Sequence, residues 1–276
     1  MKKVILVSSL IAIILGCSEK APKEMAWSLT ETIQIEGVNP IGIAALNSEI
    51  WLSDGDHNRL VKIDEKGKVV KTIDSLDRPM HIAADESALF IPQYGLDNVA
   101  VFNNGKKTAL VLKDSLDAPA GISVYKNEKA IADFYNNRIL YSNGNAWITF
   151  GKEGNAAGEF YYPTDVQITS DRIWVADAYN NRVQVFNKQG EFLRMIGVDQ
   201  KMNAATGIYV SDREVFVTDF ENDRVLIFDF EGNLKQELKE AIHKPTDILI
   251  KDDALLIINY RDGRLNRYEL KEKLKI

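Results

Sequence analysis

A recurring acid–base pair is the most prominent candidate for chemistry in this sequence. At the corresponding place of four repeats an Asp is followed five residues later by an Arg, and Asn259 with Arg264 is a softened copy. The four copies are Asp54–Arg59, Asp133–Arg138, Asp177–Arg182 and Asp219–Arg224. A single pair of this kind could orient a substrate, but a catalytic site needs only one. Because the pair recurs, we expect a structural role, in which a charge-assisted bond fixes a turn and reaches a neighbouring repeat.

A second candidate is formed by His81, Asp165 and Asp247, each of which stands two residues after the residue that opens a repeat. In the other three repeats this place is held by glycine, at Gly42, Gly121 and Gly207. An imidazole and two carboxylates are suitable ligands for a divalent metal, provided that alternate repeats converge on one axis. The alternative is that the Asp side chains bond nearby turn amides and that His81 is a solvated rim residue. No other cofactor is expected.

Aromatic residues in the turns are the third candidate. Exposed rings at one rim can stack on a sugar or hold a peptide side chain. The alternative for several of the rings is packing between repeats. His57 also lies among these turns. The predicted ligand-binding residues are Tyr94, Phe134, Tyr135, Tyr179, Phe220, Tyr260 and Arg261.

The elements that must position these residues come from an internal repeat. Six copies begin 39 to 44 residues apart, each with a Pro (Ala205 in the fifth), and most reach an Asp 14 residues later. Each copy has up to four short apolar runs, many of them alternating with polar residues and bounded by Asn, Asp or Gly, a pattern typical of strands joined by tight turns. Four strands in each of six units predict an all-β, six-bladed β-propeller of four-stranded blades with very little helix.

The ring has to close, and the sequence offers a segment for this purpose. The sixth copy ends weakly, while the strand-like run "SLTETIQIEG", residues 28–37, precedes the first copy without a partner. We predict that this N-terminal run is the outer strand of blade six, which gives a propeller domain over residues 28–276. Chain direction also predicts that the residues opening each repeat share one rim with the Asn-rich turns.

Blade two departs most from the other five. It reads "FIPQYGLDN", with Gln93 in place of the Asp and Asn98 in place of the Arg. Pro92 cannot donate a hydrogen bond to a sheet ladder. Either this blade determines ligand specificity, or its sequence has diverged without a functional role.

The repeat resembles the NHL family. The matching segments are "PTDVQITSDRIWVADAYNNRVQVFNKQGEF" (163–192), "TGIYVSDREVFVTDFENDRVLIFDFEGN" (206–233) and the lead-in "FGKEGNAAGEFYYP" (150–163). The resemblance implies a propeller fold, but NHL propellers serve as protein-binding, RNA-binding and enzymatic domains. In amidating-lyase relatives the zinc-binding histidines directly follow the opening Pro. None of the matching positions here is His: they are Ile41, Met80, Ala120, Thr164, Thr206 and Thr246.

The N-terminus resembles a bacterial lipoprotein signal. Lys2 and Lys3 precede an apolar run, residues 4–15, that is too short to span a bilayer, and the run ends in Gly16 and Cys17, the only cysteine. We predict a signal peptide over residues 1–16, lipidation of Cys17 and a tether over residues 17–27, which places the chain on a membrane of the bacterial cell envelope. The alternative is a plain signal peptide with an incidental cysteine.

These observations favour a binding protein over an enzyme. The net charge of −6 argues against a nucleic-acid partner. We expect a monomeric, membrane-anchored scaffold that recognises a peptide, protein or glycan at its rim. The alternative function is a metal-dependent lyase or hydrolase with an axial site in the propeller mouth. A third hypothesis is that the protein is a structural subunit of an envelope assembly.

Overall fold

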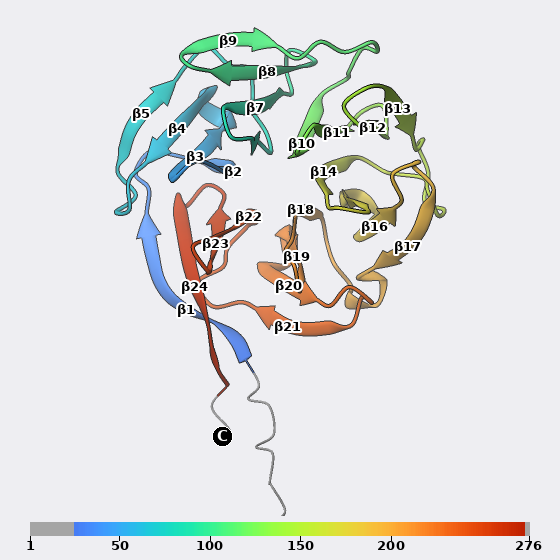
Figure 1. The fold of residues 1–276 in the computed structure, drawn as a ribbon. Helices are drawn as coiled ribbons and strands as arrows, with labels where there is room; N and C mark the ends of the chain where they lie inside the picture. The colour runs from blue at the N-terminus through green and yellow to red at the C-terminus, as the bar shows by residue number, and fades with distance from the viewer. Residues whose placement is uncertain (1–24, 274–276) are drawn as a thin grey trace, which may run out of the picture.

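The predicted propeller is confirmed. A computed structural model describes residues 25–273, and these form a closed ring of six four-stranded antiparallel sheets (Figure 1). In each of blades one to five the four strands follow one another in the sequence, from the inner strand at the axis to the outer strand at the periphery. The alternating runs identified in the sequence supply these strands, since each blade packs both of its faces against neighbouring blades.

The first three blades contain β2 to β13. Blade one comprises β2 (Pro40–Leu46), β3 (Glu49–Asp54), β4 (Arg59–Ile63) and β5 (Val69–Ile73). Blade two comprises β6 (Ala83–Ala84), β7 (Ala88–Gln93), β8 (Asn98–Asn103) and β9 (Lys106–Ala109). Blade three comprises β10 (Pro119–Tyr125), β11 (Glu128–Asp133), β12 (Arg138–Ser142) and β13 (Trp147–Phe150).

The last three blades contain the remaining strands. Blade four comprises β14 (Pro163–Ile168), β15 (Ile173–Asp177), β16 (Arg182–Phe186) and β17 (Phe192–Ile196). Blade five comprises β18 (Ala205–Val210), β19 (Val215–Asp219), β20 (Arg224–Phe228) and β21 (Leu234–Leu238). Blade six comprises β22 (Pro245–Lys251), β23 (Ala254–Asn259), β24 (Arg264–Glu272) and the N-terminal strand β1 (Met25–Gln34).

The N-terminal strand closes the ring as predicted. β1 runs antiparallel to β24, from Met25 opposite Glu272 to Gln34 opposite Arg264 (Figure 1). It begins at Met25, three residues before the predicted start, and thus includes the last part of the segment assigned to the tether. The strand starts this early because Trp27 is anchored on blade five. Its buried indole lies 5.9 Å from the Phe216 ring, centroid to centroid, and its Nε1–H donates to Glu214.

The hydrophobic core is divided into six clusters, each of which fills the interface between two adjacent blades. In the cluster between blades four and five, Trp174 and Val185 pack with Ile208 and Phe228. A blade alone would leave both of its apolar faces in water, so burial of these faces couples each blade to the next.

A second coupling between blades is polar. The turn between the second and third strands ends in a left-handed residue, Asn58 in blade one with φ of 56°. Its side-chain oxygen accepts the amide of Arg78, directly before the Pro that opens blade two, at 2.9 Å. The same bond is found at four further interfaces. The acceptor and the residue whose amide donates are Asp97 and Ala118, Asn137 and Tyr162, Asn181 and Ala204, and Asp223 and Lys244. At the sixth interface Gly263 takes this place, and its carbonyl accepts the Ile35 amide at 2.7 Å, just after β1.

Helix is as scarce as predicted. In residues 25–273 it amounts to four three-residue 3-10 turns, and none of these helices is long or apolar enough to cross a membrane. The turns are η1 (Gly55–His57), η2 (Ala178–Asn180), η3 (Val198–Gln200) and η4 (Phe220–Asn222). The predicted signal peptide and Cys17 lie outside the described residues.

Candidate functional site

The recurring Asp–Arg pairs fix the turns, as expected from their repetition. In each of the four pairs the Arg Nε donates to the Asp carboxylate at 2.6 to 2.8 Å, and all four carboxylates are buried. The second carboxylate oxygen accepts a backbone amide from the segment that leads into the same blade, such as Tyr161 for Asp177 at 2.8 Å. In blade two Gln93 and Asn98 replace the ions with a neutral side-chain bond of 2.7 Å. The pair therefore belongs to the scaffold.

Two predicted sets of residues share one rim. The residue that opens each repeat lies opposite the residue that ends the second strand, for example Pro40 opposite Asp54 and Pro163 opposite Asp177. This antiparallel register brings the start of each inner strand to the same end of the ring as the turn after the second strand. The candidate aromatics lie in or next to these turns.

Four of the predicted aromatics come together with two that were not predicted. Tyr94 of blade two contacts Phe134 and Tyr135 of blade three, with ring centroids 5.8 and 5.7 Å apart. Tyr162 stacks on both Phe134 (4.7 Å) and Tyr161 (4.5 Å). Tyr179 of blade four contacts Tyr162 at 5.1 Å. We call this group the rim patch: Tyr94, Phe134, Tyr135, Tyr161, Tyr162 and Tyr179.

The rim patch is open to solvent on part of its surface. Tyr135, Tyr161 and Tyr179 are 49%, 38% and 59% exposed, whereas Tyr94 is half-buried. Burial, followed by the neighbouring Tyr135 hydroxyl, raises the pKa of Tyr94. The Arg78 guanidinium lies 4.8 Å from the Tyr94 ring. The patch therefore combines apolar rings, hydroxyl groups and a cation.

The remaining predicted rim residues form a separate group. The ring centroids of Phe220 and Tyr260 are 6.3 Å apart, and the Arg261 guanidinium is 5.0 Å from the centroid of the Tyr260 ring. The Tyr260 hydroxyl donates to Asp56 of blade one. Both rings are half-buried, so the structure divides the predicted aromatic set into the rim patch and this smaller pair.

His81, Asp165 and Asp247 meet on the axis and form what we call the axial triad. One ligand atom from each residue lies within 4.8 Å of the other two. His81 Nδ1 is 3.5 Å from Asp247 Oδ2 and 3.8 Å from Asp165 Oδ2. All three residues are buried, so His81 is not the solvated rim residue considered as the alternative.

The carboxylates of the triad accept hydrogen bonds from backbone amides of inner strands, whereas the alternative interpretation expected amides of nearby turns. Asp165 Oδ1 accepts the Val166 amide, and its Oδ2 accepts the Ile208 amide of blade five at 2.9 Å. Asp247 repeats this arrangement with Ile248 and with Ile43 of blade one. The His81 backbone amide donates to Ala120 of blade three. Each member of the triad thus lies at a contact between an even blade and the next odd one.

Glycine at the alternate positions makes this convergence possible. A Cβ at Gly42 would lie 2.6 Å from the Met80 carbonyl oxygen and 2.8 Å from the His81 Cα. A Cβ at Gly121 would lie 2.9 Å from the Asp165 Cα. These contacts are too short for any side chain, so glycine in the odd blades lets the inner strands of the even blades approach.

Burial dominates the electrostatics of the triad. Burial raises the pKa of Asp165 to about 7, with the Asp247 carboxylate acting in the same direction and His81 opposing both. Burial lowers the pKa of His81, but attraction to Asp165 and Asp247 outweighs this effect, and the net direction is upward. Such opposing contributions to a pKa are typical of a compact group of ionisable side chains that is kept from water.

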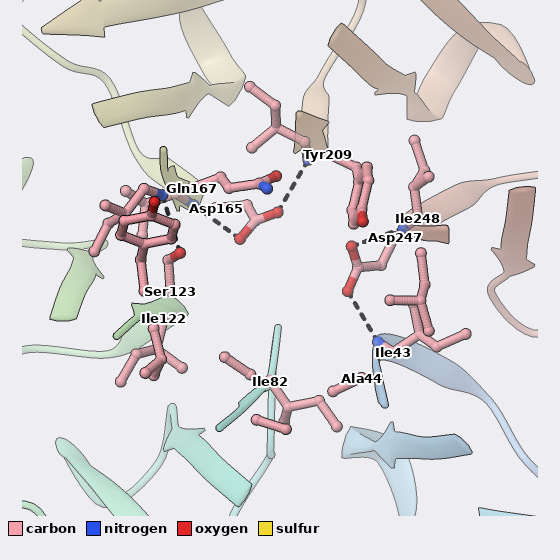
Figure 2. Close-up of a pocket in the computed structure, with 18 of the residues that line it drawn as sticks. Ile43, Ala44, Ile82, Ile122, Ser123, Asp165, Gln167, Tyr209, Asp247 and Ile248 are labelled. Carbon is pink, nitrogen blue, oxygen red and sulfur yellow. Dashed lines mark hydrogen bonds between the residues drawn. The ribbon is translucent and has the colours of Figure 1, made fainter. Parts of the chain in front are cut away.

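A cavity of about 260 Å³ adjoins the triad on the axis. The inner strands of all six blades line it, and its wall is mostly aliphatic, with Ile43, Ile82 and Ile122 among its residues. Figure 2 shows Asp165 and Asp247 on facing sides of this cavity, with their hydrogen bonds to the chain. The triad therefore has room for a small ligand or for water on one side.

The family comparison bears on the fourth blade. Residues 160–186, from just before β14 to the end of β16, match the family model described as the NHL repeat. The fourth blade carries an NHL repeat. Over 47 residues the chain is also 47% identical to the protein lin-41 of Caenorhabditis elegans, a match that covers 17% of this chain and 4% of that protein. The matched segment thus spans a small part of the length of that relative.

Solved structures show the same fold at low identity. A streptogramin B lyase structure matches with a TM-score of 0.66 and 14% identity, over 90% of this chain and 98% of that chain. A catalytically inactive virginiamycin B lyase from Staphylococcus aureus, solved with quinupristin, matches with a TM-score of 0.65 and 13% identity, over 90% of this chain and all of that chain. At this identity the likeness concerns the fold alone.

Tyr161 and Tyr162 are the site residues that sequence reasoning missed. They directly precede Pro163, and the register of Pro163 with Asp177 brings them to the rim. The signal was available, because any residue just before the opening Pro lies at the same end as the turns. The aromatic residues that were predicted all belong to the turns.

Proposed function

We propose that this NHL propeller is an extracytoplasmic binding module that captures an extended segment of a partner protein on the rim patch. The observation that carries the proposal is the convergence of six aromatic side chains from three blades, three of them at least 38% exposed. Aromatic side chains with a polar end are the groups that dominate protein–protein recognition. A glycan is less well matched, because Tyr162 is stacked against two other rings and offers little open face to a sugar.

The charges around the rim patch suggest the chemistry of the partner. A hollow of about 320 Å³ beside Tyr161 is lined by Glu153, Glu159 and Asn180. Glu153 is exposed, and the Ala156 amide followed by Lys152 lowers the pKa of Glu159, which keeps that carboxylate charged. A Lys or Arg of the partner could occupy this hollow while an adjacent apolar residue contacts the rings.

Peptide and glycan arrays probed with the labelled full chain test this proposal. We expect signal on peptides that combine a basic and an apolar residue, reduced at least about tenfold by Tyr135→Ala or Tyr179→Ala, since interface anchors contribute more than about 1.4 kcal/mol. Glu153→Gln should weaken the binding of peptides that contain a basic residue more than the binding of the others. The matched control is Tyr260→Ala, which removes a ring from the other group. Signal confined to glycans, or peptide signal indifferent to both tyrosine changes, would contradict the proposal.

The module is proposed to be lipid-anchored through Cys17 at the bacterial cell envelope. The support is the basic and apolar leader that ends at the only cysteine of the chain. Detergent phase partitioning of the expressed chain tests this step separately. The unmutated chain should enter the detergent phase and Cys17→Ser the aqueous phase. A cysteine variant that partitions like the unmutated chain would exclude the anchor without affecting the proposed rim function.

A further inference from the structure

The axial triad has an unexplained polar atom. His81 is 4% exposed, and its Nδ1 is buried without a hydrogen-bond partner among the described residues. The nearest carboxylate oxygens are 3.5 and 3.8 Å away, beyond the 2.7 to 3.2 Å of a normal hydrogen bond. Leaving a buried ring nitrogen unsatisfied costs free energy, and a native structure seldom accepts this cost without a reason.

The spacing that is too long for hydrogen bonds suits a bound cation. We infer that the axial triad is a zinc site, with His81 Nδ1 and one oxygen each from Asp165 and Asp247 as ligands. Ligands at about 2.0 to 2.1 Å from a tetrahedral zinc lie about 3.3 Å from one another. The two distances from His81 Nδ1 are close to this value, and a modest inward movement of the carboxylates would complete the set.

The donor set favours zinc over other common cations. Calcium and magnesium prefer oxygen ligands throughout, whereas zinc accepts an imidazole nitrogen together with carboxylate oxygens. The fourth position would face the axial cavity, which Asp165 and Asp247 both line. Three protein ligands with a water in the fourth position is an arrangement that zinc adopts in proteins.

The surroundings already orient the ligands. Each carboxylate is fixed by two backbone amides, one of them from the next blade, and each oxygen keeps a lone pair for a metal. Bound zinc would join blades two, four and six at the axis, so zinc binding should also stabilise the ring. This inference concerns residues of the axis and does not depend on the proposed rim function.

Metal content decides the inference. The full chain, purified without a histidine tag, is loaded with Zn²⁺, dialysed and analysed by mass spectrometry for metal. We expect one zinc per chain and a rise in Tm on loading. His81→Ala should weaken zinc binding by more than about 100-fold, since loss of a ligand exceeds the effect of an outer-shell change. The matched control removes the two exposed histidines, His57→Ala with His243→Ala, and should leave the stoichiometry at one.

A second measurement covers the case in which His81→Ala does not fold. X-ray absorption of the zinc-loaded unmutated chain should show one imidazole and an otherwise oxygen-based shell, and it should be unchanged in the variant that lacks both exposed histidines. The inference is overturned if the unmutated chain retains no zinc, if His81→Ala retains it equally well, or if the absorption spectrum lacks imidazole scattering.

Discussion

The Asp177 carboxylate and the Arg182 guanidinium meet at 2.8 Å across the turn between β15 and β16, and both side chains are buried. Arg182 also donates to the carbonyls of Asn155, Ala156 and Glu159 in the segment that enters blade four from blade three. The pair thus ties a turn to the connection between two blades. This arrangement explains why an ion pair that could serve catalysis is repeated around the ring.

Replacing Arg182 should be costly. Arg182→Ala leaves the Asp177 carboxylate buried without its cation, so the free energy of unfolding should fall by about 3–5 kcal/mol. Arg59→Ala is the matched control, because Arg59 is 26% exposed against 8% for Arg182 and water can reach Asp54 once the side chain is gone. Urea denaturation measures both. Equal losses at the two sites would contradict the argument from burial.

The left-handed Asn residues that join the blades make a separate prediction. Asn137→Gly keeps the backbone conformation but removes the acceptor for the Tyr162 amide, and stability should fall by about 1–2 kcal/mol. Because Tyr162 belongs to the rim patch, ring packing should loosen as well, with a change in near-ultraviolet circular dichroism. Asn104→Gly is the control, since Asn104 is an exposed left-handed residue at the tip of the β8–β9 hairpin. A similar loss in both variants would mean that the interblade bond contributes little.

The repeat made the fold predictable, and the reason is physical. Alternating runs specify strands, six similar units specify a ring, and a strand-like run without a partner specifies closure by β1. The start of β1 was less predictable, because it depends on the contact of Trp27 with Phe216, a residue of blade five far away in the sequence.

The interblade bonds were not predicted, although the residues that make them were visible. The Asn and Asp residues of the turns were interpreted only as residues that bound the strands at tight turns. The conformation of the turn orients their side chains toward the next blade, as with Asn58 and the Arg78 amide. The periodicity of the sequence does not predict this orientation. The meeting of His81, Asp165 and Asp247 was foreseen because alternate blades of a six-membered ring have three-fold symmetry.

Closure of the ring should depend on the start of β1. Trp27→Ala removes a buried indole and its bond to Glu214, so stability should fall by about 3–5 kcal/mol. Met25→Ala lies in the same strand at a side chain that is 47% exposed, and it should change stability by less than about 0.5 kcal/mol. Thermal unfolding of the two variants provides the comparison. A stable Trp27→Ala chain would show that closure does not rely on the first residues of β1.

The alternation of glycine with His or Asp on the axis gives the last prediction. Gly207 has ordinary φ, but a Cβ there would overlap the carbonyl oxygen of Thr246 in blade six, next to Asp247. The backbone of β22 would have to move, so Gly207→Ala should lower the free energy of unfolding by about 1–3 kcal/mol through overpacking.

Gly37→Ala is the control that separates overpacking from backbone strain. Gly37 has φ of 68° and nothing within 4 Å of its Cβ position, so this change should lower the free energy of unfolding by about 1 kcal/mol. If the axial glycines are there to let alternate inner strands approach, Gly207→Ala should also displace Asp247 and weaken zinc binding, whereas Gly37→Ala should not. A Gly207→Ala chain with full stability and full zinc affinity would remove the structural reason for the alternation.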